Sequence, residues 1–254
     1  MASQSILLFP PPSLASCMSL AIVRDTRRAD LADADRLNYF PASPLVALSV
    51  VAHGELRYSD ALCDLSDIRR TGVLASITAT PPQTQPSLSW SDGPINAITV
   101  GFFPDAWASL GGDVASGDIP KRVSAAAAIF LQSDDIAADW PKFCTTLESI
   151  WTPTRKTQGP AQWAGSHKVA DWTRHLLTHT SLSGVGQSAR SFERRMKRWT
   201  GQSQRRLTQL SQLENLHHLH VKDPNAPLAA IAAEASLHPV AAARLPMVAS
   251  EAGR

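Results

Sequence analysis

The segment Ser188–Gly201, with the sequence SARSFERRMKRWTG, decides the fold of the C-terminal third of the chain. The serine at its start suits the N-cap of a helix, because its hydroxyl can accept a hydrogen bond from a free amide of the first turn. The glycine at its end suits the position after a helix, where a left-handed residue often closes the last turn. We therefore predict a helix from this serine to about Thr200.

This helix has two different faces. Phe192, Met196 and Trp199 fall at positions i, i+4 and i+7, which makes one apolar face that can pack on neighbouring helices. Basic residues occupy the rest of the circumference. Between Ser188 and Arg206 there are seven basic residues and a single acid, Glu193.

Guanidinium groups on such a helix suit nucleic acid. Their planar fork of donors matches phosphate oxygens and the O6/N7 edge of guanine, and a helix held by its opposite face can enter a major groove. Charge spacing alone leaves open a solvated surface, an acidic protein partner or membrane headgroups. The residues predicted to contact DNA are Ser188, Arg190, Ser191, Arg194, Arg195, Lys197, Arg198 and Arg205.

Helical periodicity extends on both sides of this segment. We predict a preceding helix over about His167–His179, with Val169, Trp172 and Leu176 inward. A following helix should run from about Ser203 to Lys222, with a leucine at every third position and a stop at Asp223-Pro224. A short helix over Leu228–Ala235 is predicted last.

The charge distribution divides the chain near residue 150. Residues 1–150 carry a net charge of −6 and residues 151–254 a net charge of +8. Such an asymmetry suggests two functions, and the basic half suits a polyanion. The polar, turn-rich residues around Pro153 and Pro160 suit a linker. We predict a regulatory domain over 1–152, a linker over 153–162 and a helical DNA-binding domain over 163–254.

The first 150 residues have the pattern of a mixed, strand-rich domain. Short apolar runs bounded by Pro, Gly and Asp predict strands at Leu45–Ala52, Leu74–Thr80 and Ile95–Phe103. Helices are predicted at Pro104–Leu110, Val123–Gln132 and Ala137–Ile150. The fold class expected for the whole chain is therefore α+β, with a strand-rich mixed domain followed by an all-α helix-turn-helix domain.

The segment 186–201 resembles the first helix-turn-helix of AraC-type transcriptional regulators. In that family a turn glycine leads into a recognition helix of the pattern Ser-x-Arg-x-apolar-x-Arg, which ends in an aromatic residue, a threonine and a glycine. The resemblance covers about Trp163–Leu237. The matching positions here are Gly186, Ser188, Arg190, Phe192, Arg194, Arg195, Met196, Trp199, Thr200 and Gly201.

Two parts of the chain depart from the family pattern. Residues 180–185 replace the usual Leu-Ala-x-x-Leu-Gly of the first motif. After Leu237 a second recognition helix would follow in the family, but this chain has Pro239 and Pro246 in a short tail rich in small residues. A proline inside a helix removes a backbone donor and clashes with the preceding turn. We therefore predict that residues 238–254 are irregular and that the second helix-turn-helix is incomplete.

Other chemistries have weaker support in the sequence. Cys17, Cys63 and Cys144 form no CxxC pair, which fits a reducing cytoplasm and argues against a disulfide framework. The four residues ending at Cys17 resemble a lipoprotein cleavage box, but no basic residue precedes them. No apolar stretch reaches the length of a membrane-spanning helix.

The sequence contains little support for a metal or enzyme site. His217, His218 and His220 lack the cysteines or carboxylates of a metal site. His53, Asp64 and Asp67 could converge in an enzyme site, but their spacing does not require it. No hydrolase or phosphoryl-transfer motif is present. We expect neither a catalytic site nor a metal or other cofactor.

The function predicted from the sequence is a cytoplasmic, sequence-specific DNA-binding transcriptional regulator, impaired by its incomplete second motif. Its expected partners are double-stranded DNA and, through the N-terminal domain, a small-molecule effector or a second copy of the chain. The alternative is a ligand- or partner-binding module that does not bind DNA specifically.

Overall fold

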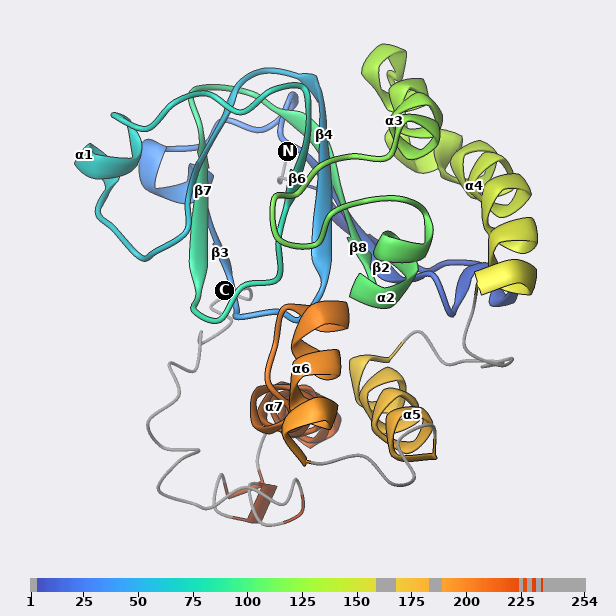
Figure 1. Cartoon of the computed structure of the whole chain (residues 1–254). Helices are drawn as coiled ribbons and strands as arrows, with labels where there is room; N and C mark the ends of the chain where they lie inside the picture. The colour runs from blue at the N-terminus through green and yellow to red at the C-terminus, as the bar shows by residue number, and fades with distance from the viewer. Residues whose placement is uncertain are drawn as a thin grey trace.

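The computed structural model describes residues 4–158, 168–182, 189–223, 226–227, 230–231 and 234. This part of the chain has a mixed α+β fold with two antiparallel sheets, as expected in outline (Figure 1). The larger sheet has the strand order β1 (Gln4–Leu8), β2 (Met18–Asp25), β8 (Asn96–Phe102), β4 (Val46–His53) and β6 (Ile77–Thr80). The smaller sheet has the order β3 (Leu37–Phe40), β7 (Ser87–Ser91) and β5 (Leu56–Ser59).

The described helices lie mainly in the second half of the chain. They are α1 (Leu65–Ile68), α2 (Pro104–Ser109), α3 (Lys121–Ala127), α4 (Ile136–Gln158), α5 (Val169–Leu182), α6 (Ala189–Thr200) and α7 (Gln204–Lys222). Three short 3-10 helices, η1 (Pro12–Leu14), η2 (Asp33–Arg36) and η3 (Ala128–Gln132), join the other elements.

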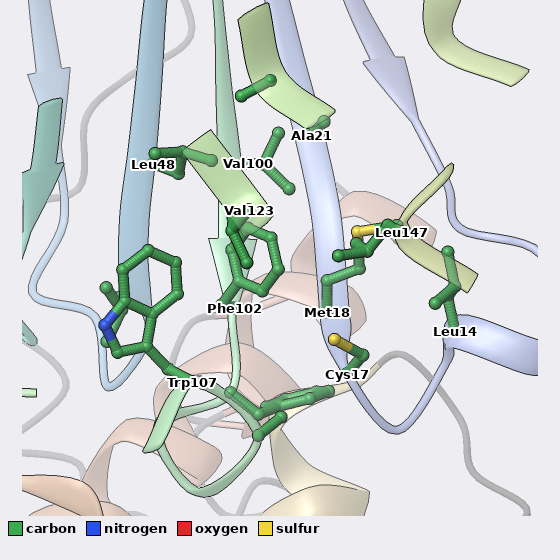
Figure 2. Packing of buried hydrophobic residues seen from close by; sticks show 14 of the residues in the cluster. Leu14, Cys17, Met18, Ala21, Leu48, Val100, Phe102, Trp107, Val123 and Leu147 are labelled. Carbon is green, nitrogen blue, oxygen red and sulfur yellow. The ribbon is translucent and has the colours of Figure 1, made fainter. Parts of the chain in front are cut away.

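The main hydrophobic core lies between the larger sheet and the helices α3 and α4. Alternate residues of the central strands point into it, since side chains of a strand alternate between its two faces. Leu48 of β4 and Val100 and Phe102 of β8 are fully buried there, and Val123 of α3 and Leu147 of α4 meet them from the helical side (Figure 2).

The helices of the C-terminal third share this core with the sheet. Trp172 of α5, Met196 of α6 and Leu207 of α7 are almost completely buried in the same cluster as the strand residues. Figure 1 shows these three helices grouped beyond one end of the sheets, next to α2. The core is therefore continuous between the two halves of the chain. The domain limits expected near residues 152 and 163 stay a prediction.

Several elements lie where the sequence predicts them. The strands expected at Leu45–Ala52 and Ile95–Phe103 correspond to β4 and β8, and each end differs by one residue. The helix expected at Pro104–Leu110 corresponds to α2. The strand expected at Leu74–Thr80 is shorter than predicted, because β6 begins only at Ile77.

Helix α4 extends further than its pattern indicated. It was expected to end at Ile150 but continues to Gln158, into the first part of the predicted linker. Pro153 lies inside the helix. A proline inside a helix removes one backbone hydrogen bond and crowds the preceding turn, yet the helix continues past this residue. Just before it, Trp151 is buried and donates its indole N–H to Ser16 Oγ at 3.3 Å, which holds this turn of the helix against the core.

Candidate nucleic-acid interface

Helix α6 is fixed to the rest of the protein by its apolar face. Met196 and Thr200 have no exposed surface. The Thr200 hydroxyl donates to the Met196 carbonyl at 2.7 Å and accepts from the Gln202 amide at 3.0 Å, so it joins the last turn of the helix to the following loop. Gly201 has a φ of +68°, the left-handed conformation predicted for the residue that ends this helix.

The predicted basic face of α6 is open to solvent. Arg190, Arg194, Lys197 and Arg198 are all exposed. The first three follow the i, i+4, i+7 spacing and so share one side of the helix. None of the ion pairs between described residues involves any of the four. Their charges are therefore not neutralised by carboxylates of the described part of the protein.

The other predicted contact residues have different surroundings. Arg205, at the start of α7, is exposed, and Ser191 is half-buried. Ser188 and the side chain of Arg195 lie outside the described residues, as do the side chains of Phe192 and Trp199. The structure thus places five of the eight predicted contact residues at the surface, namely Arg190, Arg194, Lys197, Arg198 and Arg205.

Arg206 has a structural role that its position in the basic run did not indicate. Its guanidinium donates to the carbonyl of Thr84, in the loop before β7. Its backbone amide donates to the Ser203 hydroxyl at 3.2 Å, so Ser203 caps the start of α7. Arg206 therefore ties the start of α7 to the sheet region and is less free than Arg205 to meet a ligand.

Helix α5 is held by a carboxylate from a different helix. Glu214 of α7 accepts hydrogen bonds from the backbone amides of Val169 at 3.0 Å and Ala170 at 2.7 Å. These amides belong to the first turn of α5, where helical donors have no partner within the helix and negative charge is favoured. No local pattern indicates this contact, because Glu214 lies more than forty residues from the amides it caps.

Helix α5 also contacts α2. The Trp172 indole N–H donates to Asp105 Oδ1 at 2.9 Å, and the Trp172 ring stacks on Phe103, with ring centroids 5.2 Å apart. Asp105 lies in the first turn of α2. Together with the contact of α6 on α2, this pair sets the position of the basic helix relative to the sheet.

The alternative candidate sites are not assembled among the described residues. Asp64 caps α1 by accepting from the Asp67 amide, and Asp67 pairs with Arg70. The Ser66 hydroxyl, with the Asp67 amide, holds the pKa of Asp64 below its ordinary value, which suits a helix cap. No group of three potential metal ligands occurs in the described part of the chain.

Two further predictions concern the end of the chain and the membrane. The side chains of His217, His218 and His220 and the tail over 238–254 lie outside the described residues. Of the helix predicted at Leu228–Ala235, Ala230, Ile231 and Glu234 are helical, and Ile231 packs on Leu216 of α7. No helix in the described ranges has the length and apolar character needed to cross a bilayer.

Comparison with known proteins identifies no relative. A scan against models of protein families, a search of curated proteins and a search of solved structures each found no match. The functional argument therefore depends on the residues and contacts described above.

Proposed function

We propose that this chain binds double-stranded DNA through the exposed basic face of α6 and acts as a cytoplasmic transcriptional regulator of the AraC type. The observation that carries the proposal is the division of α6 into a buried and an exposed side. Met196 and Thr200 are completely buried, whereas Arg190, Arg194 and Lys197 are exposed and without carboxylate partners among the described residues.

The arrangement supports insertion of α6 into a groove. A helix needs a rigid support on one side and projecting donors on the other in order to read a major groove. Helices α5 and α7 supply that support, because they contact each other closely and both contact α6. Arg205 extends the basic surface onto the start of α7, where it can reach a phosphate beside the groove.

Affinity should come mainly from phosphates. With a single basic helix in the described part of the chain, few base contacts are available, so release of counterions should dominate the binding free energy. We expect binding that weakens steeply as salt is added. Preference for one sequence should be modest, since each good base contact contributes only about 1–3 kcal/mol of discrimination.

A fluorescence-anisotropy titration with labelled duplex DNA at several salt concentrations tests the proposal. The informative variant carries Arg190→Ala, Arg194→Ala and Lys197→Ala. A matched control carries Lys121→Ala, Arg122→Ala and Lys142→Ala, which removes the same charge from exposed positions on α3 and α4. The first triple variant should flatten the slope of log K against log salt by about 0.9 for each lost phosphate contact, and the control should leave the slope unchanged.

Two results would count against the proposal. An equal loss of affinity in both triple variants would show that only net charge matters. No binding even at low salt would favour the alternative, a ligand- or partner-binding module without specific DNA binding. If the chain does bind DNA, selection from a random duplex pool separates a sequence-specific regulator from a general DNA-binding protein, because only the regulator enriches one sequence.

A further inference from the structure

Strand β1 forms one edge of the larger sheet. All five of its residues pair antiparallel with β2, from Gln4↔Asp25 at one end to Leu8↔Ala21 at the other. Among the described residues, no strand pairs with β1 on its other side. An edge strand presents a row of backbone N–H and C=O groups to which a further strand can bind.

The opposite edge of the same sheet is covered. It is formed by β6, and the loop between α2 and α3 passes beside this strand (Figure 1). Gly117 of that loop has a φ of +73° and lies so close that a Cβ atom on it would be 2.6 Å from the carbonyl oxygen of Ala79 in β6. Folded proteins often cover a sheet edge with a loop to prevent association. In the part of the chain that the structure describes, no comparable loop pairs with β1.

The edge formed by β1 also lacks the charges that protect many edge strands. Lysine and other charged residues on an edge strand keep it from pairing with another chain. No acidic, basic or histidine residue occurs between Met1 and Val23. By contrast, β3, which is an edge of the smaller sheet, directly follows η2 with its Asp33, Asp35 and Arg36. A like strand can therefore lie beside β1 without repulsion between its side chains.

One face of β1 presents large apolar side chains to solvent. Side chains of a strand alternate between the two faces of its sheet. Ile6 and Leu8 pack against the main core, whereas Leu7 is 56% exposed and Phe9, just past the end of the strand, is 53% exposed. Ile22, the register partner of Leu7 in β2, is half-buried and extends this apolar stripe. An exposed apolar stripe beside an open edge indicates a surface for another protein chain.

The position of this edge is fixed by the rest of the fold. Trp140 of α4 donates its indole N–H to the carbonyl of Phe9 at 3.2 Å, which attaches the end of the strand to the helix behind the sheet. The three prolines that follow, residues 10–12, have no backbone N–H and so cannot extend the ladder. A strand that is already formed loses little conformational entropy when it pairs with another.

A second copy of β1 matches this edge by symmetry. Two identical strands related by a two-fold axis perpendicular to the sheet run antiparallel, and each offers the other the same row of donors and acceptors. The same axis keeps the exposed faces of both strands on one side, so Leu7 and Phe9 of the two copies form one continuous apolar stripe. A partner selected by charge is disfavoured, because β1 has no charged side chain to attract it.

We propose that the chain forms a two-fold dimer in which β1 of each copy pairs antiparallel with β1 of the other, so that the two larger sheets become one. This dimer gives the second copy expected from the sequence a defined surface, and it does not depend on DNA binding by α6. Because β1 has only five residues, the axis that pairs most of them passes near its middle. Leu7 of one copy then lies opposite or diagonal to Leu7 of the other. Small interfaces are weak, so the dimer should dissociate reversibly on dilution.

Sedimentation velocity of the full chain at several concentrations tests the proposal, and we expect a monomer–dimer equilibrium. Leu7→Lys should weaken dimerisation by about tenfold or more, because the lost apolar contact and the added like charge occur twice in a symmetric interface. Leu62→Lys changes a leucine of nearly equal exposure, 54%, before α1 and should leave dimerisation unchanged. Leu7→Glu should weaken it as Leu7→Lys does. An equimolar mixture of these two variants should dimerise more tightly than either alone, because opposite charges then meet across the paired strands.

Hydrogen exchange on the original chain locates the interface without any substitution. The amides of Gln4–Leu8 that do not bond to β2 should exchange more slowly as the concentration rises, while the amides of β3 should not change. The proposal is overturned if the chain sediments as a monomer at every concentration, or if Leu7→Lys dimerises as the original chain does. It is also overturned if the mixed variants associate no better than each alone, or if exchange along β1 does not depend on concentration.

Discussion

Trp172 of α5 donates its indole N–H to the Asp105 carboxylate of α2 at 2.9 Å, across sixty-seven positions of the sequence. The same ring stacks on Phe103 and is 1% exposed. This contact joins the helices of the C-terminal third to the end of the sheet.

Removing this hydrogen bond should destabilise the protein without disrupting the core. Trp172→Phe keeps an aromatic ring against Phe103 but leaves Asp105 without its indole donor. We expect a loss of about 1–3 kcal/mol in the free energy of unfolding, the cost of breaking a hydrogen bond to a charged group. Urea unfolding measures it. Trp151→Phe, which loses a hydrogen bond only to the neutral Ser16 hydroxyl, serves as the control and should cost less.

The two faces of α6 should separate stability from DNA binding. Met196→Ala removes a fully buried side chain and should cost about 2–5 kcal/mol of stability. Arg194→Ala changes an exposed residue and should alter stability by less than about 0.5 kcal/mol, while weakening DNA binding. Thermal melts and anisotropy titrations on both variants check this. The reverse order of effects would mean that the buried and DNA-facing sides of α6 are misassigned.

The Glu214 cap should be essential for the first turn of α5. Glu214→Ala leaves the amides of Val169 and Ala170 without their acceptor, which should cost about 1–2 kcal/mol, as for loss of an N-cap. Hydrogen exchange at these two amides should accelerate strongly. Glu55→Ala, at an exposed position, serves as the control. Unchanged exchange at both amides would show that another group caps the helix.

Buried thiols should make the protein less stable at alkaline pH. Burial, with a smaller contribution from the Glu148 charge, raises the pKa of Cys144 from 9.0 to about 12. Burial likewise raises the pKa of Cys17 well above its ordinary value, with Asp105 contributing less. Above pH 9 the unfolded chain loses these protons while the folded chain keeps them, so rising pH favours unfolding.

The loss of stability with rising pH, and the pH range over which it occurs, can be measured directly. The thiol contribution to stability is complete below pH 9 and declines as pH rises toward the folded pKa of Cys144. Each thiol accounts for at most about 1.4 kcal/mol per pH unit in that range. Urea unfolding of the original chain and of Cys144→Ala at several pH values tests it. Equal slopes for the two proteins above pH 9 would contradict the prediction.

Local patterns predicted the helices of the C-terminal third closely. The helix expected from Ser188 to Thr200 is observed as Ala189–Thr200, and the one from Ser203 to Lys222 as Gln204–Lys222 with the serine as its cap. These predictions succeeded because caps, glycine ends and helical periodicity are properties of neighbouring residues. The helix expected at His167–His179 is observed as Val169–Leu182, so it continues into the polar residues at which it was expected to end.

The strands were predicted less completely. The long apolar runs of β4 and β8 predict these two strands, whereas no pattern predicted β1, β2, β3, β5 or β7. Ser87, Ser89 and Ser91 interrupt the apolar pattern of β7 in the sequence. They are buried only because β3 and β5 pair with that strand on both sides and the larger sheet faces it.

The sequence by itself determined the amphipathic character of α6, with its basic residues at a spacing that puts them on one side, because helical geometry acts over four residues. Only the tertiary structure sets which residues of distant segments contact each other. Glu214 meets the amides of α5, Trp172 meets Asp105, and Arg24 meets Asn38 between two sheets. Each pair joins residues far apart along the chain, so its formation depends on the packing of whole elements and not on any local pattern.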